Sequence, residues 1–396
     1  MDLLGRRVSE SEEGQPFRLS VERMLLTQFR SYSNLVLEVG PGPVVLIGDN
    51  GAGKTNLLEA LSLLAPGRGL RGARVTDMRR RGAEETGWGV AVELSAVGGS
   101  IQIGTGVSSK ADGTREVRVQ GAASSSQDGL ARELHVIWLT PQMDRIFIGS
   151  PGDRRRFFDR LVLGFDPGHS ARLGAYQRTL AERARILRYR PDDTEWLSAL
   201  ERTMSENAVA ISAARHEALW RLNTGLASPL GTLFPPAELE LVGVAESLLQ
   251  DWPALEVEER LLKAFAAARA EDAAKGGSSV GPHRTDLSVR HVVNDIPAEH
   301  CSTGEQKMLL VSIILAHAQA QSKLFGQTPL ILLDEVMAHL DGAHRSALTE
   351  ALCSLGSQVW MTGTTDALFS KFGSRGQFLH VSDGAVRNLR MGDVNI

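Results

Sequence analysis

The sequence predicts an α/β fold in which both ends of the chain form one unit, a mixed sheet with helices, and the middle third forms an inserted helical lobe. Short β-branched and aliphatic runs alternate with glycine-rich turns up to about residue 150, and similar runs return after about residue 280. Between them, apolar residues recur three or four positions apart. We therefore predict a mobile polar tail over 1–16, a first lobe from 17–150 and 281–396, and a helical arm over 151–280.

The individual elements follow from the same periodicities. Strands are predicted at 19–26, 35–39, 44–47, 89–94, 101–103, 116–119, 136–139, 285–293, 330–334, 358–362 and 378–381. Helices are predicted over 54–64 and 308–320 in the first lobe and over 254–274 in the arm. One long amphipathic arm helix is predicted from Leu197 to Leu222, because its apolar residues share one face.

Composition excludes several classes of protein. The 396 residues are 42% hydrophobic, which is enough for real cores. Cys301 and Cys353 form neither a zinc motif nor a disulfide framework, which fits a reducing compartment. The apolar run 308–316 is far shorter than the roughly 20 residues of a membrane span. We therefore expect a cytoplasmic protein without a membrane partner. The net charge of -4 leaves a local basic surface possible.

A glycine-rich loop carries the strongest local signal. The segment GDNGAGKT fits G-x-x-x-x-G-K-[ST] between a predicted strand and a predicted helix. It predicts a phosphate-binding loop in which Lys54 reaches the terminal phosphates and the Thr55 hydroxyl ligates Mg²⁺. A chance glycine-rich turn is the weaker alternative. The predicted nucleotide-binding residues of this loop are Gly48, Asp49, Asn50, Gly51, Ala52, Gly53, Lys54 and Thr55.

A buried strand that ends in two carboxylates supplies a second element. In PLILLDE, Asp334 is expected to hold Mg²⁺ through water, and Glu335 to polarise the attacking water. Such a strand is usually structural when it occurs alone, but the phosphate loop favours the catalytic interpretation. Asp341 follows on a turn, where it either caps a helix or contributes to nucleotide binding.

A third element is STGEQK, which opens an apolar helix. The pattern is a capping box, with Ser302 as N-cap and Glu305 reaching back. Ser302, Gly304 and a helix N-terminus would also receive a γ-phosphate. A second phosphate receptor, so far along the chain from the first, suggests a nucleotide held between two bodies.

These motifs, in this order, resemble the ATPase heads of the ABC and SMC class. That resemblance implies two heads that sandwich two ATP molecules. Lys54 and Thr55 of one copy would then face Ser302 and Gly304 of a second copy across a two-fold axis. ATP would close the homodimer, and hydrolysis would release it.

Further segments resemble the RecF family of bacterial recombinational repair. They are QFRSYSNLVLEVGPG, NLLEALSLLAPGRGLR, SPGDRRRFFDR and GPHRTDL. The resemblance implies an ATP-dependent DNA-binding dimer with slow, DNA-stimulated ATPase activity. It would act with RecR and RecO at single-strand gaps or gapped duplexes, assist RecA assembly, and contribute to replication restart and the SOS response.

Two departures from the expected pattern concern residues that sense the nucleotide. The turn after the strand at 136–139 reads PQMD, so Gln142 is either a γ-phosphate and metal sensor or a turn residue. No histidine follows the strand at 358–362, and Thr364 and Thr365 are the candidate substitutes. Both departures are compatible with slow turnover.

Arginine clusters are the candidate DNA contacts. Between residues 66 and 81, six arginines outnumber one acid, Asp77, and guanidinium groups suit phosphate. The predicted DNA-binding residues are Arg68, Arg71, Arg79, Arg80 and Arg81, with Arg74 in the same cluster. A second cluster comprises Arg154, Arg155, Arg156 and Arg160. The alternatives are a solvated ion-paired face, contacts between the lobes, or nucleotide contact. For His283 and Arg284 the alternatives are a tight turn or a role at the lobe junction or nucleotide.

Three rival functions share this chemistry. One is an ABC-transporter ATPase subunit, which the long helical insertion disfavours. Another is an SMC-like tether, although a 30-residue helix spans only about 45 Å. A third is an ATP-gated binding module in which hydrolysis merely resets the clamp.

Overall fold

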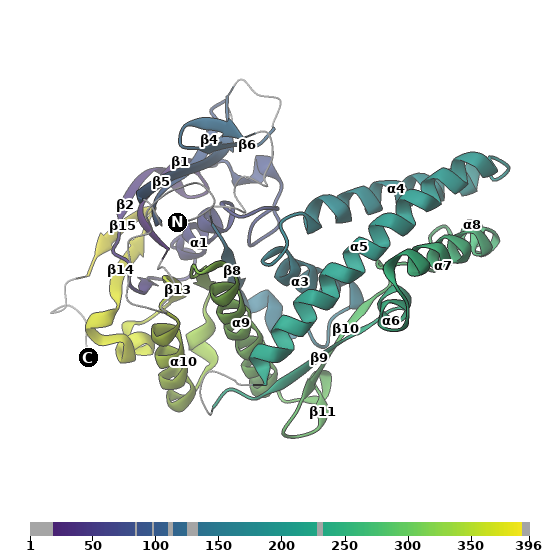
Figure 1. Ribbon diagram of the computed structural model, residues 1–396. Helices are drawn as coiled ribbons and strands as arrows, with labels where there is room; N and C mark the ends of the chain where they lie inside the picture. Colours follow the sequence, from purple (N-terminus) through teal and green to yellow (C-terminus); the bar gives the residue numbers. More distant parts are fainter. Residues whose placement is uncertain are drawn as a thin grey trace, which may run out of the picture.

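The protein is an α/β head with a helical arm that projects from it, with β1 and β15 both lying in the head (Figure 1). The computed structural model describes residues 19–83, 85–96, 99–109, 114–124, 134–227 and 233–389. The tail predicted over 1–16 lies outside these residues. The predicted fold class, a mixed sheet with helices and an inserted helical lobe, is confirmed.

A six-stranded mixed sheet forms the centre of the head. Its order is β15 (Ala385–Asn388), β14 (Gln377–Ser382), β3 (Val44–Ile47), β13 (Val359–Gly363), β12 (Leu330–Leu333) and β8 (Val136–Leu139). All neighbours are parallel except β14 and β15. β3, β12 and β13 are buried throughout, as expected for continuous aliphatic runs covered on both faces.

An antiparallel sheet covers one side of the head. Its order is β2 (Tyr32–Glu38), β1 (Ser20–Phe29), β4 (Trp88–Ala96), β5 (Gly99–Val107), β6 (Glu116–Val119) and β7 (Ala122–Ser124). One core lies between this sheet, helix α1 (Lys54–Ser62) and one face of the central sheet. A second core lies on the other face, against α3 (Pro151–Leu163), α9 (Thr303–Phe325) and α10 (Gly342–Leu355).

Helix α9 would be long and apolar enough to cross a membrane, judged by length and composition. In the described structure, however, 72% of its most apolar window is buried inside the protein. It packs against α5 (Thr194–Leu226), β8 and α10, which explains why the helix is apolar on nearly all sides.

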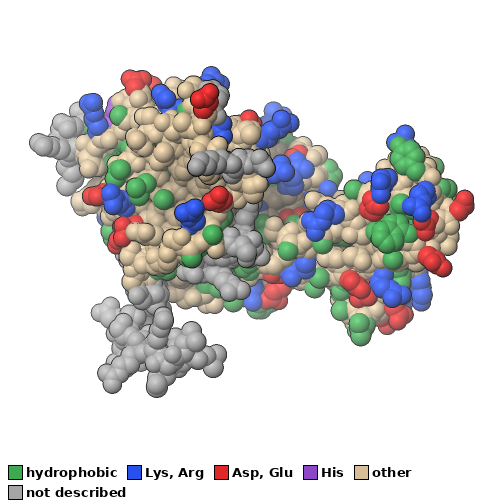
Figure 2. Space-filling model, turned by 90° about the horizontal axis from the view of Figure 1, so that it is seen from above, with side chains coloured by type: hydrophobic (Ala, Val, Ile, Leu, Met, Phe, Trp, Pro, Cys, Tyr) green, Lys and Arg blue, Asp and Glu red, His purple; other side chains and the backbone are tan. Residues whose placement is uncertain are grey.

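The arm is built from antiparallel helices (Figure 1). The helices are α3 (Pro151–Leu163), α4 (His169–Tyr189), α5 (Thr194–Leu226), α6 (Val244–Asp251), α7 (Ala254–Ala267) and α8 (Arg269–Lys275). The long predicted helix is α5, whose 33 residues span about 50 Å at 1.5 Å per residue. An apolar cluster from α4, α5 and α7 holds the arm together, and Lys and Arg side chains mix with Asp and Glu on its surface (Figure 2).

A small third sheet joins the arm to the head, and its strand at 237–242 is not predicted from the sequence. β9 (Ala237–Val242) pairs with β10 (Asp286–His291), which pairs with β11 (Ile296–Pro297). The strand predicted at 285–293 therefore lies outside the central sheet. β9 buries alternate residues of AELELV, but the prolines before it obscured that alternation.

Short 3₁₀ segments connect these elements. They are η1 (Val75–Met78), η2 (Pro141–Arg145), η3 (Ala298–His300), η4 (Val336–His339) and η5 (Asp366–Arg375).

Candidate nucleotide-binding site

The glycine-rich loop joins β3 to α1, as the motif predicts. Gly53 is the residue before α1 and has φ 108°, a conformation that favours glycine. A Cβ there would lie 2.8 Å from Ser31 Oγ and 2.9 Å from Tyr32 Oη, so the loop must pass close to these side chains. No side chain caps α1, which leaves the N–H groups of its first turn able to bind an anion.

Lys54 is the first residue of α1, and its side chain folds back onto the phosphate loop. Its Nζ donates to the carbonyl oxygens of Gly48 at 2.6 Å and Asp49 at 2.9 Å, and only 4% of the residue is exposed. Burial lowers the pKa of Lys54, and the charges of Glu335, Asp334 and Asp49 partly oppose this shift. The ammonium group is therefore partly shielded from water and interacts electrostatically with these carboxylates.

Thr55 and Asp334 meet directly, although 279 positions separate them in the sequence. Thr55 Oγ1 donates to Asp334 Oδ1 at 2.9 Å, and the buried Thr362 donates to the same oxygen at 2.8 Å. A hydroxyl and a carboxylate side by side are oxygen ligands that suit Mg²⁺. Among the described residues, no group of three or more His, Cys, Asp or Glu forms a separate metal site. The residues present thus fit Mg²⁺ bound together with a nucleotide phosphate.

Glu335 has the least usual backbone conformation in this region. It has φ 54° and ψ 20°, in the left-handed region that costs energy for a residue other than glycine. Its N–H donates to Thr362 Oγ1 at 2.9 Å, which helps to hold this conformation. Its charge partly opposes the lowering of the Lys54 pKa by burial.

Thr362 is a residue that the sequence analysis did not select. It lies on β13 next to both β3 and β12, and it contacts Asp334 and the Glu335 backbone at once. The candidates Thr364 and Thr365 follow β13 and are exposed. Only knowledge of the strand order, in which β13 separates β3 from β12, could have identified Thr362.

Gln142 lies at the same edge of the sheet as Asp334. β8 runs parallel to β12, and the Asp334 N–H donates to the Leu139 carbonyl at 2.9 Å. Gln142 is exposed on η2, immediately after β8. Asp144 on the same turn forms a 3.1 Å ion pair with Lys307 of α9. The turn therefore connects the phosphate edge to the helix that begins with the STGEQK motif.

Ser302 does form the predicted capping box. Its Oγ accepts from the Glu305 N–H at 3.3 Å, and Glu305 Oε2 accepts from the Ser302 N–H at 2.8 Å. The hydrogen bond from the Ser302 side chain lowers the pKa of Glu305. Ser302 and Gly304 nevertheless remain exposed at the N-terminus of α9. Within the described residues, no hydrogen bond joins either of them to the phosphate loop of the same chain.

Asp341 caps α10 and lies close to Gly304. It accepts from the His344 N–H at 2.9 Å, and this bond lowers the pKa of Asp341. Gly304 and Asp341 line one open pocket of about 450 Å³. The structure therefore places the predicted site residues in two groups, with the phosphate loop, Asp334 and Glu335 in one and Gly304 and Asp341 in the other.

The first arginine cluster is partly anchored. Arg71 donates to Asn56 at 2.8 Å and to the fully buried Glu59 at 2.9 Å, and Arg30 pairs with the same carboxylate. Because Asn56 directly follows Thr55, Arg71 lies beside the phosphate loop. Arg79 and Arg80 are half-buried against the end of β1, whereas Arg68 and Arg81 are exposed.

Three members of the second arginine cluster make structural contacts, whereas the side chain of Arg156 is 73% exposed and pairs with Asp153 of the same helix. Arg154 pairs with Asp286 at 2.6 Å, and Arg155 donates to the Thr285 carbonyl at 2.7 Å. Arg160 stacks on Trp138 and Phe157, and burial lowers its pKa to about 9. These arginines join α3 to β10 and to the head.

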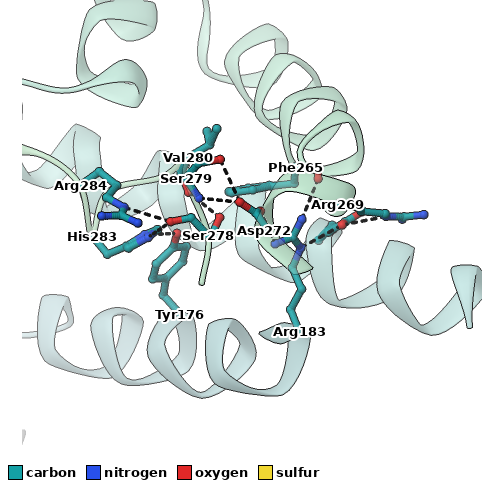
Figure 3. Close-up of polar contacts among 11 residues, drawn as sticks. Tyr176, Arg183, Phe265, Arg269, Asp272, Ser278, Ser279, Val280, His283 and Arg284 are labelled. Carbon is teal, nitrogen blue, oxygen red and sulfur yellow. Dashed lines mark hydrogen bonds and ion pairs between the residues drawn. The ribbon is translucent and has the colours of Figure 1, made fainter. Parts of the chain in front are cut away.

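The GPHR segment, residues 281–284, contacts helix α4 and the chain just before it (Figure 3). Tyr176 Oη and His283 Nδ1 lie 2.9 Å apart, and His283 Nε2 lies 2.9 Å from the Ser278 carbonyl. Burial lowers the pKa of His283. A Cβ on Gly281 would lie 2.1 Å from Tyr176 Oη. These contacts join the segment to α4 and to the chain just before it, and the alternatives of a lobe-junction or nucleotide role stay predictions.

Comparison with known proteins agrees with this geometry. The fold and the site define an ATPase head of the ABC and SMC class, and the family model "RecF/RecN/SMC N terminal domain" matches residues 20–385. The protein named DNA replication and repair protein RecF of Mesorhizobium japonicum is 47% identical over 374 residues, covering 94% of this chain and 98% of the relative. That of Agrobacterium fabrum is 44% identical over 373 residues, covering 93% and 98%. The chain belongs to the RecF family.

Solved structures share the fold. A structure of the recombination mediator protein RecF-ATPrS in the RecFOR pathway superposes with a TM-score of 0.83 at 22% identity, covering 95% of this chain and 100% of that one. An Smc head bound to the C-winged helix domain of ScpA gives 0.53 at 17% identity, covering 93% and 96%. The transporter and tether alternatives are not favoured, because the RecF relatives match nearly end to end.

Proposed function

We propose that this chain is an ATP-dependent DNA-binding protein of recombinational repair. It would dimerise on ATP at single-strand gaps, assist RecA loading, and contribute to replication restart and SOS induction. The printed names of its relatives, DNA replication and repair protein RecF, support this role. So does the likeness of its fold to structures of RecF-ATP and RecF-ATPrS in the RecFOR pathway. The observation that carries the proposal is the contact of Thr55 with Asp334 beside the buried Lys54.

The chain's own residues have distinct proposed roles in ATP hydrolysis. The loop Gly48–Thr55 would hold the phosphates, with Lys54 on the terminal phosphates. Thr55 and Asp334 would hold Mg²⁺, which supplies charge neutralisation when it is bound. Glu335 would orient and deprotonate the attacking water, and its strained backbone fixes its position. Gln142 and Thr364 or Thr365 would sense the γ-phosphate.

The second half of the site would come from another copy of the chain. Ser302, Gly304 and Asp341 are exposed, and no hydrogen bond in the described structure joins them to the phosphate loop of their own chain. We therefore propose that they complete the partner's site across a two-fold axis. The same proposal divides the chain into a head from 17–150 and 281–396 and an arm over 151–280.

DNA would bind through its phosphates. The exposed Arg68, Arg71 and Arg81, with Arg79 and Arg80, form the proposed surface beside the phosphate loop. This proximity would let DNA stimulate a slow ATPase. RecR, RecO and RecA are the proposed protein partners, and the cytoplasm is the proposed location.

Size-exclusion chromatography with light scattering tests the central step. We expect the wild-type chain to be monomeric without nucleotide and dimeric with ATP, with gapped DNA promoting assembly. Ser302→Arg should prevent dimerisation while the monomer still binds ATP. The exposed Ser198→Arg, on the arm, is the control and should dimerise normally. A wild-type monomer that binds and hydrolyses ATP alone would overturn the proposal.

A further inference from the structure

The hairpin between β10 and β11 exposes two adjacent aliphatic side chains. Val292 is 47% exposed and Val293 is 72% exposed, and both lie in the turn. Hairpin turns ordinarily carry polar residues or glycine, and exposed β-branched residues gain nothing from water there. Asp295, with φ 52°, completes the turn. The segment presents a small apolar knob, defined here as Val292 and Val293.

This knob is anchored next to Ser302. Asn294 Nδ2 donates to Glu305 Oε1 at 3.0 Å, while Glu305 Oε2 accepts both the N–H and the hydroxyl of Ser302 at 2.8 Å. Within the turn, the Asn294 N–H also donates to His291 Nδ1 at 3.3 Å. One carboxylate thus fixes the knob relative to the N-terminus of α9.

A pocket opens beside the hairpin and the N-terminus of α9. The pocket of about 450 Å³ lies between the base of the hairpin, the first turns of α9 and the start of α10. Apolar and polar side chains both line it, including His291, Met308, Leu340 and His344. The pocket includes His291, next to the knob in sequence, and Gly304, two residues after the exposed Ser302, so the three features lie close together. Such a surface suits contact with a protein partner.

Charge indicates which partner fits this surface. Two carboxylates line the pocket, those of Glu305 and Asp341. The Asp341 side chain is 65% exposed, and hydrogen bonds lower the pKa values of both groups. The phosphate-loop face of the same chain is instead flanked by arginines, of which Arg71 contacts Asn56 next to Thr55. In a two-fold dimer, the acidic face of one copy meets the basic face of the other.

We propose that Val292 and Val293 form a contact with a second copy of this chain, outside the nucleotide. This inference rests on the proposed ATP-dependent dimer and extends it. The second copy would contact the hairpin in addition to the shared nucleotide. Because Glu305 bonds both Asn294 and Ser302, the hairpin and the phosphate receptor engage the partner as one unit.

Sedimentation velocity with a non-hydrolysable ATP analogue tests this contact. Val293→Asp places a charge on the knob and should weaken the dimer at least tenfold, while nucleotide binding to the monomer stays within twofold of wild type. The milder Val293→Ser should weaken the dimer severalfold. Leu255→Asp, at a residue 79% exposed on the arm, is the matched control and should dimerise like wild type. Equal melting temperatures would show that all variants fold.

The outcomes separate this inference from the proposed function. If Ser302→Arg prevents dimerisation while both Val293 variants dimerise like wild type, the hairpin contact is wrong and the nucleotide sandwich stands. If the Val293 variants instead lose only binding to another protein or to DNA, the knob belongs to that partner and the inference is overturned. A wild-type chain that stays monomeric with the analogue overturns both proposals.

Discussion

A single hydroxyl group, that of Thr362, contacts both acidic residues that follow β12, one through its carboxylate and the other through its backbone. It donates to Asp334 at 2.8 Å and accepts from the Glu335 N–H at 2.9 Å. The motifs in the sequence predict site roles for Lys54, Thr55, Asp334 and Glu335, because each motif is confined to one loop or one strand. Thr362 has no motif of its own, and its role depends on the position of β13 between β3 and β12.

Replacing Thr362 with Val tests this role. The change keeps the shape of the side chain but leaves the Glu335 N–H without its acceptor, which costs about 1–3 kcal/mol. We expect ATPase activity to fall at least tenfold and the melting temperature to fall measurably. Thr224→Val, at an exposed threonine on α5, is the control and should change neither. Full activity of Thr362→Val would show that the hydroxyl is dispensable.

Glu335→Gln should separate ATP binding from hydrolysis. An amide has nearly the same shape but cannot accept the proton of the attacking water, so we expect a loss of about 100-fold or more in turnover. ATP should then accumulate in the dimer, as light scattering would detect. Glu350→Gln on α10 is the control, since Glu350 pairs with Arg375 on the surface. Rapid turnover by Glu335→Gln would remove Glu335 from the role of base.

At the scale of elements, the arginine-rich segment before β4 shows that arginines clustered in the sequence are not all free to bind a ligand. Six arginines follow one another closely in the sequence, yet Arg71 is held by Asn56 and Glu59, and Arg79 and Arg80 pack along β1. In the second cluster, Arg154 and Arg160 serve packing. The spacing of the arginines in the sequence could not show which of them are held in this way. The acidic and aromatic side chains that hold them come from elements far away in the sequence.

Charge reversal of Arg79, Arg80 and Arg81 tests the DNA surface. We expect weaker binding of gapped DNA and a shallower slope of log affinity against log salt, because fewer counterions are released. Reversal of Arg185, Arg188 and Arg190 on the arm is a charge-matched control and should change neither quantity. Affinities measured at several salt concentrations provide the comparison. An unchanged slope would exclude the segment from the interface.

At the scale of the whole molecule, buried ion pairs join the helices of the arm to one another. Arg183 is 1% exposed and bonds Asp272 at 2.7 Å and Glu201 at 2.9 Å (Figure 3). Burial alone would raise the pKa of Asp272, but hydrogen bonds from Arg183 and Ser279 outweigh it and lower the pKa. Such pairs stabilise the arm only while the carboxylate stays ionised.

Asp272→Asn should therefore destabilise the protein in a pH-dependent way. Because the folded pKa is below the unfolded value of about 3.9, the stabilisation is present above pH 4 and is lost as pH falls through the folded pKa. We expect a loss of about 3 kcal/mol near pH 7 that shrinks below pH 4. Thermal unfolding across pH measures it, with the exposed Asp192→Asn as control. A constant difference at all pH values would contradict the assignment.

The sequence by itself determined the fold class, an α/β unit with a helical insertion, and its motifs predicted the residues of the nucleotide site. Phosphate loops, strands that end in acids, and amphipathic helices have local patterns, since neighbouring residues alone set their geometry. Only the tertiary structure decided that Thr362 joins Asp334 and Glu335, that β9 pairs with β10, and that Asn294 of the β10–β11 turn bonds Glu305 of the Ser302 capping box. These relations join residues far apart in the chain, and packing of the whole molecule creates them.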